Sequence, residues 1–178
     1  MGLWVARRPE LGAGLLVVVS LLIAGTVNPL STSVSTTDDL PIAGAIKQVD
    51  AEAPGGWIMQ TNRIPAAVLL EDAVHTYSVV YNYPQLELWH QLDPTGAHAE
   101  SYNRYGYADF TLRRGPVQFP PYLLDQFSIA IDGCDPFIQR NVKHVVTDYG
   151  IDTACTRLRS SVTSGSRVFY IYDVVPPP

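Results

Sequence analysis

The chain has 178 residues, of which 47% are hydrophobic and 16% are charged, and it contains ten Tyr and three Trp. This composition is typical of a folded protein and excludes a low-complexity or disordered chain. The formal net charge is −5 and Lys and Arg form no basic cluster, which argues against a phosphate backbone as partner. We therefore expect no nucleic-acid binding.

The first predicted element is an apolar run from Leu11 to Val27, which holds no charge over 17 residues. This length is at the lower edge for one membrane-spanning helix. Arg7 and Arg8 precede the run and the first following cation is Lys47, so the positive-inside rule places the N-terminus in the cytoplasm. We expect a cytoplasmic segment, a single transmembrane helix, a tether and an extracytoplasmic domain, over residues 1–10, 11–30, 31–40 and 41–175.

A cleaved signal peptide is the alternative, because it also has a basic start and an apolar middle. Here the apolar middle is longer than usual, and the small residues at Ala24-Gly25-Thr26 or Ser31-Thr32-Ser33 form a weak cleavage pattern. The sequence therefore favours a retained helix in the cell membrane. Together with Trp4 ahead of the arginines, it also suggests that this helix is the last crossing of a longer protein.

The segment after the tether begins with helical patterns. Residues 41–49 repeat apolar side chains at helical spacing, with Asp38 or Asp39 as cap and Pro41 in the first turn. Residues 57–60 predict a short buried strand, a second helix is expected from Pro65 to Leu70, and residues 85–92 are expected to form two helical turns. Residues 77–84 combine strand-forming side chains with loop residues and stay unassigned.

The second half of the domain is rich in strand patterns. Four β-rich runs are bounded by Gly, Pro, Asp or Asn, at residues 107–112, 127–131, 142–147 and 168–174. Two or three helices with about five strands predict one small α/β or α+β domain with a mixed sheet. Cys134 and Cys155 both fall in the part assigned outside the cytoplasm, where a disulfide is permitted, and we expect them to form one; two unrelated buried thiols are the alternative. Such a bond would stabilise the fold by roughly 3 kcal/mol.

Polar and aromatic side chains are densest between His75 and Tyr107. Aromatic faces mixed with Asn, Asp and Arg suit a sugar, because C–H groups lie on the rings while planar side chains bond the hydroxyls. We expect the contacts to come from Tyr83, Trp89, Asp93, Asn103 and Arg104. The competing interpretation is that the aromatic residues cover the edge of the domain or pack against the membrane-proximal surface, and that Arg104 pairs with Asp93 or Asp109.

Other chemistry has weaker support. Glu87 and His90 with His98 and Glu100 could be drawn as a metal site, but this spacing arises often by chance, so we expect no metal and no cofactor. A carboxylate pair for glycoside chemistry, Glu87 with Asp93 or Asp93 with Asp109, has no known separation. No nucleophile motif and no phosphate-binding glycine loop is present. The turn Asp132-Gly133-Cys134-Asp135-Pro136 is expected to serve stability.

Several short motifs carry a resemblance to a known class of protein. They are Val27-Asn28-Pro29-Leu30, the helix Pro41–Val49, Gly56-Trp57-Ile58, Leu92-Asp93-Pro94, Tyr102-Asn103-Arg104-Tyr105 and residues 141–146. Over nearly its whole length the chain resembles the C-terminal end of large polytopic bacterial membrane proteins related to GT-C type glycosyltransferases. The resemblance implies lipid-linked sugar donors and catalytic acids in an early extracytoplasmic loop, and that loop is absent here.

These observations predict a non-catalytic extracytoplasmic domain of a membrane protein of cell-envelope glycan assembly. Its expected partners are the lipid bilayer, a glycan or lipid-linked sugar, and other membrane spans or subunits of a glycosyltransferase-like protein. A purely structural or interaction domain is the alternative, and a free-standing secreted hydrolase, which requires cleavage of the apolar run, is a third.

Overall fold

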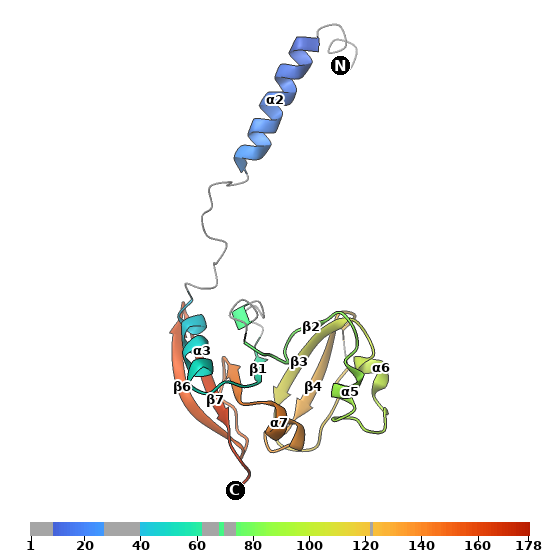
Figure 1. The fold of residues 1–178 in the computed structure, drawn as a ribbon, viewed down its shortest axis with the longest axis vertical. Coiled ribbons are helices and arrows are strands. Elements are labelled where there is room, and N and C mark those ends of the chain that lie inside the picture. Colours follow the sequence, from blue (N-terminus) through green and yellow to red (C-terminus); the bar gives the residue numbers. More distant parts are fainter. Residues whose placement is uncertain (1–8, 27–39, 62–67, 70–73, 122) are drawn as a thin grey trace. The chain divides into compact units, whose positions relative to one another are not determined.

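The computed structural model describes residues 9–26, 40–61, 68–69, 74–121 and 123–178 (Figure 1). The chain divides into two units, Met1–Thr36 and Thr37–Pro178. The first unit contains one described helix, and the second contains two sheets with the remaining described helices.

Helix α2, Pro9–Thr26, coincides closely with the predicted apolar run. Its large apolar side chains from Leu15 to Ile23 are exposed, between 42% for Val19 and 69% for Leu16. Within the described ranges, no helix is both long enough and apolar enough to cross a membrane. The transmembrane helix over residues 11–30 therefore stays a prediction, and its last residues, 27–30, lie outside the described part.

The second unit is a mixed α/β fold with two sheets, so the predicted fold class is confirmed at this level. The four-stranded sheet has the order β1-β5-β7-β6 and the three-stranded sheet has the order β2-β3-β4. The strands are β1 Trp57–Gln60, β2 Val80–Tyr81, β3 Gly106–Leu112, β4 Gln126–Ile131, β5 His144–Thr147, β6 Thr156–Ser164 and β7 Arg167–Val174. The helices are α3 Pro41–Glu52, α5 Leu86–Trp89, α6 Ala99–Tyr102 and α7 Pro136–Asn141.

The four-stranded sheet separates two hydrophobic clusters, because successive side chains on a strand point to opposite faces. On one face, Ile42, Ile46 and Val49 of α3 pack with Trp57 of β1 and Ile171 of β7. The opposite cluster combines the four-stranded sheet with the three-stranded sheet, α5, α6 and α7; its members include Ile58, Val145, Tyr172, Phe110, Phe127 and Phe137. Helix α3 thus covers one face of the sheet, as Figure 1 shows.

The two sheets are joined by the segment 75–81. Trp57 N donates to His75 O at 2.8 Å and Tyr77 N donates to Trp57 O at 2.9 Å, so the segment starts alongside β1. It then becomes β2, which pairs antiparallel with β3. Strands β3 and β4 run parallel from Tyr107↔Gln126 to Leu112↔Ile131. One continuous stretch of backbone therefore belongs to both sheets.

Gly56 shows why glycine follows α3. A Cβ placed on Gly56 would lie 2.1 Å from Asn141 O and 2.7 Å from the Tyr77 ring. The Gly56 carbonyl accepts from Lys143 N at 2.7 Å and from His144 N at 3.2 Å. This close approach lets β1 pair with β5, and a larger side chain would separate the two strands.

Most of the predicted elements lie within two residues of their observed bounds. The helix predicted from Pro65 lies outside the described residues except for Val68 and Leu69, which are helical and fully buried. The unassigned stretch 77–84 contributes the short strand β2. Strand β6 and helices α6 and α7 were not among the predicted elements.

Candidate functional site

Trp89 lies in the core. Its indole is fully buried and packs edge-on against Tyr81 at a centroid distance of 5.1 Å and against Phe127 at 5.2 Å. Among the described residues its Nε1 atom has no hydrogen-bond partner. Desolvation by burial raises the pKa of Tyr81, and the electrostatic interaction with Tyr77 raises it further. In this structure the ring of Trp89 is therefore a packing element without access to a sugar.

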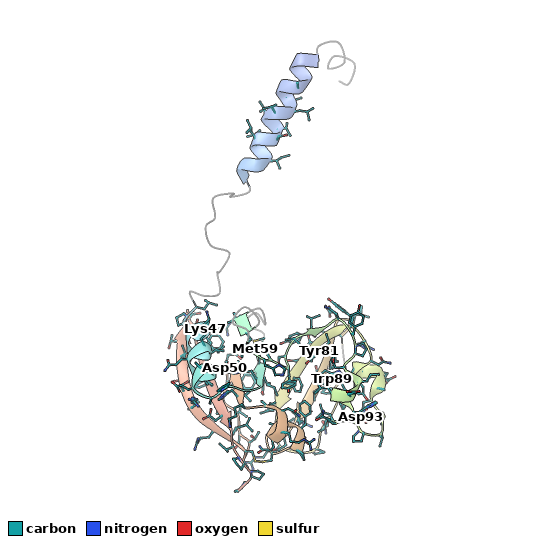
Figure 2. All side chains as sticks on the ribbon, viewed as in Figure 1. Lys47, Asp50, Met59, Tyr81, Trp89 and Asp93 are labelled. Atoms are coloured by element: carbon teal, nitrogen blue, oxygen red, sulfur yellow. A yellow bond between two sulfur atoms is a disulfide. The ribbon has the colours of Figure 1, made fainter. Side chains whose placement is uncertain are left out.

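Asp93 is also buried, and it organises the loop that follows it (Figure 2). Its carboxylate accepts from His98 N at 2.7 Å, Ala97 N at 3.1 Å, Tyr102 Oη at 3.1 Å and Thr95 Oγ1 at 3.2 Å. Burial alone would raise the pKa of Asp93, but these four donors together hold it below its ordinary value. Each oxygen of the Asp93 carboxylate thus accepts two hydrogen bonds from the residues that follow it.

The Asp93 loop supports the residues after α6. Tyr102 is fully buried. Desolvation by burial is the largest cause that raises the pKa of its phenol, and the hydrogen bond to Asp93 is the second. Asn103 is exposed, and Arg104 donates through Nε and Nη2 to Glu100 O at 3.2 and 2.8 Å. The guanidinium is thus held against the carbonyl of a residue in α6, next to an amide side chain that faces solvent.

Two tyrosines lie next to these polar side chains. Tyr83 is 78% exposed and follows β2, and Tyr105 is 59% exposed and precedes β3. The pairing Tyr81↔Gly106 brings the end of β2 to the beginning of β3. We call Tyr83, Asn103, Tyr105 and the partly exposed Arg104 the aromatic–polar edge. It contains three of the five predicted contact residues, while Trp89 and Asp93 lie beneath the surface.

The residues considered for metal binding do not come together. In the part of the chain that the structure describes, no group of three or more His, Cys, Asp or Glu side chains could hold a metal ion. His98 instead stacks on Phe119 at a centroid distance of 5.0 Å. Glu87, His90 and Glu100 are exposed.

Asp93 and Asp109 do not form a carboxylate pair across one cleft. Asp109 alternates with the buried Ala108 and Phe110 along β3, so it points away from the cluster that contains Tyr102, the partner of Asp93. Burial raises the pKa of Asp109, although a bond from Gln126 Nε2 at 3.2 Å opposes this effect. The alternation of buried and partly buried residues along β3 is a signal from which the sequence could have predicted that Asp109 lies on the polar face of this strand.

Tyr107 shares this polar face with Asp109. Burial, with a smaller contribution from the charge of Asp109, raises the pKa of Tyr107 to about 12. In the parallel register, Gln126 lies opposite Tyr107 and Ser128 lies opposite Asp109. The face therefore carries a short ladder of half-buried polar side chains, which the sequence analysis did not single out.

The predicted disulfide between Cys134 and Cys155 is confirmed, with a Cα–Cα distance of 5.1 Å. Asp132 Oδ1 accepts from Cys134 N at 2.8 Å, and Asp135 caps α7 by accepting from Phe137 N at 2.8 Å. Together these bonds fix the turn and the start of α7. The turn has the stabilising contacts that its sequence predicted.

His144 is the centre of a buried polar network that the sequence analysis missed. Its Nε2 atom lies 2.7 Å from Ala53 O and its Nδ1 atom lies 3.0 Å from Asp173 Oδ1. Both ring nitrogens therefore face oxygen atoms of other elements. Trp57 packs against the ring at 4.7 Å, and Arg159 donates to Asp173 at 3.2 Å. The network ties the end of α3 to β5, β6 and β7.

Two shallow grooves flank α3. One, of about 270 Å³, lies between the start of α3 and the β6–β7 turn, and the other, of about 300 Å³, lies between α3 and β6. The second contains the ion pair between Arg159 and Glu52 at 2.5 Å. Neither groove includes a residue of the aromatic–polar edge.

Residues 36–178 match the protein family described as "Domain of unknown function (DUF7654)". The matched region almost coincides with the second unit, Thr37–Pro178. No curated protein and no solved structure matches the chain.

Proposed function

We propose, from the premise that this chain belongs to the DUF7654 family, that it is the membrane-anchored, non-catalytic part of a cell-envelope glycan assembly system and that its extracytoplasmic domain binds glycan. The observation that carries the proposal is the aromatic–polar edge. Two exposed tyrosine rings lie beside an exposed amide and a guanidinium that α6 holds in place. Rings and planar donors in this combination suit the two kinds of surface that a sugar presents.

The anchor is supported by α2. From Leu15 to Ile23 the helix exposes large apolar side chains, and eight of them are each more than two-fifths exposed. Contiguous apolar surface of this kind is unfavourable in water and is covered by lipid or by other apolar helices. We propose that α2 inserts in the cell membrane, with Arg7 and Arg8 on the cytoplasmic side.

The extracytoplasmic location of the domain is supported by the bond between Cys134 and Cys155. Disulfides persist mainly in oxidising compartments and are rare in the cytosol. The location also agrees with the direction that the two arginines give to α2.

A binding role without catalysis is supported by the hydrogen bonds of Asp93, the acidic side chain that lies beneath the edge. Both oxygens of Asp93 accept hydrogen bonds from its own loop, so neither is directed at a substrate. In the GT-C type glycosyltransferases that the sequence resembles, the catalytic acids lie in an early extracytoplasmic loop, so we assign that role to no residue described above. Lipid-linked sugars and other membrane spans or subunits are the partners implied for the assembly.

The test is a binding measurement on the full chain in detergent against a panel of cell-envelope oligosaccharides. We expect the double variant Asn103→Ala with Arg104→Ala to weaken binding by about tenfold, as expected when two or more hydrogen bonds to a sugar are lost. Thermal unfolding should stay close to that of the unmodified chain, because Asn103 is exposed and Arg104 is partly exposed.

Arg113→Ala provides the matched control. Arg113 is an exposed arginine that follows β3 at the end opposite the aromatic–polar edge, so its removal should leave saccharide binding unchanged. Equal binding by the double variant and the unmodified chain would contradict the proposal. Collapse of the double variant would contradict it as well, because the edge would then be part of the fold.

A further inference from the structure

The most exposed large apolar side chains of the folded unit gather at one end of the three-stranded sheet. Leu124 is 94% exposed, Tyr83 78%, Leu123 65% and Tyr105 59%, and among the described residues from 40 onward no other large apolar side chain is exposed to this degree. The next is Leu158, at 52%, on β6 of the other sheet.

The backbone fixes these residues together. Leu123 N donates to Gln126 O at 3.1 Å, so Leu124 and Asp125 form the tip of a tight turn just before β4. Tyr107 N donates to Asp125 O at 2.8 Å, which brings this turn against the beginning of β3, where Tyr105 lies. Because β3 and β4 are parallel, both strands start at this end. We call Tyr105, Leu123 and Leu124 the apolar tip.

The apolar tip lies on the same side of the folded unit as the start of α3. Figure 1 shows the start of α3 and the starting ends of β3 and β4 on the same side of this unit. The covalent link from Thr26 to Leu40 can extend over about 50 Å at most. A membrane that holds α2 is therefore always within reach of the folded unit.

We propose that the apolar tip docks on the surface of the bilayer that holds α2. Two leucines at the end of a rigid turn can enter the outer acyl region, and tyrosine rings are favoured at the level of the headgroups. Asp125, at the same turn, limits the insertion to a shallow depth. This inference rests on the membrane anchor of the proposed function.

The charge of the domain selects the type of lipid. Beyond residue 30 the chain has ten cations and sixteen anions, because Arg7, Arg8 and Glu10 are its only charges before that point. The resulting net charge of −6 repels anionic headgroups, so we expect docking on zwitterionic lipid. The docked tip shares Tyr105 with the aromatic–polar edge and holds this edge at the bilayer surface. The saccharide that the edge meets there is therefore one attached to the membrane.

The experiment places spin labels on the full chain in phosphatidylcholine vesicles. Labels are attached at Leu124→Cys for the tip, Leu158→Cys as a matched exposed leucine, and Val18→Cys in α2, with the native disulfide intact. Collision rates with oxygen, which concentrates in lipid, and with a water-soluble nickel chelate are then measured. We expect the label at position 124 to be at least about fivefold better protected from nickel than the label at 158, while staying open to oxygen.

The three labels separate the possible outcomes. If position 18 is protected and position 124 collides with nickel as freely as position 158, the docking is wrong and the anchor stands. Free access of nickel to position 18 would overturn the anchor, and the docking with it. Protection of position 124 from both reagents would indicate a protein partner on the tip and would also overturn the inference. Adding Leu123→Ser should restore nickel access at position 124 if lipid covers the tip.

Discussion

At the scale of single residues, Asp93 illustrates how a carboxylate that is predicted to contact a sugar can instead stabilise the fold. The sequence Asp93-Pro94-Thr95-Gly96 predicts a turn, and a turn leaves backbone N–H groups that need acceptors. Asp93 satisfies two of these donors, Ala97 N and His98 N, together with two hydroxyl groups. The negative charge of Asp93 therefore stabilises the loop through these hydrogen bonds.

We predict that Asp93→Asn lowers the free energy of unfolding by about 2–3 kcal/mol at pH 7, because an amide cannot accept from all four donors. The pKa of Asp93 is lowered by folding, so its contribution is complete above the ordinary carboxyl range and is lost as the pH falls through the folded value. Urea unfolding of both proteins between pH 7 and pH 2 should therefore converge at acidic pH.

The matched control for this change is Glu87→Gln, an exposed carboxylate in the first turn of α5. We expect it to change stability by less than about 0.5 kcal/mol. An equal loss in both variants would show that Asp93 contributes only its surface charge.

Asp109 should behave in the opposite way. Its pKa is raised because its ionised form is partly desolvated on β3, so folding favours the protonated acid. Asp109→Asn is expected to stabilise the domain at pH 7 by on the order of 0.5 kcal/mol, a value reduced by solvent screening. The gain should be absent below the ordinary carboxyl range and appear as the pH rises through it. A loss of stability at pH 7 would instead indicate that the charge of Asp109 is itself stabilising.

At the scale of elements, the disulfide joins the turn before α7 to the turn before β6. The two cysteines are 21 residues apart, and a cross-link over such a loop stabilises a fold by about 3 kcal/mol in the chain-entropy treatment. We expect the double variant Cys134→Ala with Cys155→Ala to lose about this amount in guanidinium unfolding. Reductant should lower the midpoint of the unmodified protein and leave that of the variant unchanged.

The elements that could be predicted from the sequence are those with a clear period. Strands β3 and β4 alternate or concentrate apolar side chains, and α3 repeats them at Ile42, Ile46 and Val49. Strand β6 was missed because it lies at the edge of its sheet and its sequence, Thr156–Ser164, contains mostly polar and charged residues. The parallel pairing of β3 with β4 depends on contacts made in the folded chain, which a local pattern does not contain.

The residues of the candidate site also divide into two groups. Tyr83, Asn103 and Arg104 were predicted as contact residues and are at least partly exposed. Trp89 was predicted as well, but it is buried in the core because its ring is large and apolar. The sequence could not say which side chains of this region would be used for packing. Glycan contact by the exposed residues stays a prediction for the saccharide-binding experiment.

At the scale of the whole molecule, the chain joins an apolar helix to a folded unit of different chemistry. Helix α2 exposes apolar side chains, while the unit Thr37–Pro178 buries two hydrophobic clusters and carries the acidic charge. The family match begins at residue 36, close to the start of the folded unit. The spin-label experiment addresses this scale, because it reads the helix and the folded unit in one sample.

The position of β7 has a consequence for how the domain is made. Strand β7 lies inside the four-stranded sheet, with β5 on one side and β6 on the other, although it follows both in the chain. During synthesis, β1 and β5 can pair early, but β6 has no neighbour until residues 167–174 have emerged. If the domain is translocated while it is synthesised, as the proposed topology implies, β5 and β6 reach the outside before the strand that pairs with both of them. During this interval β6 has no partner strand, and an unpaired strand is open to mispairing.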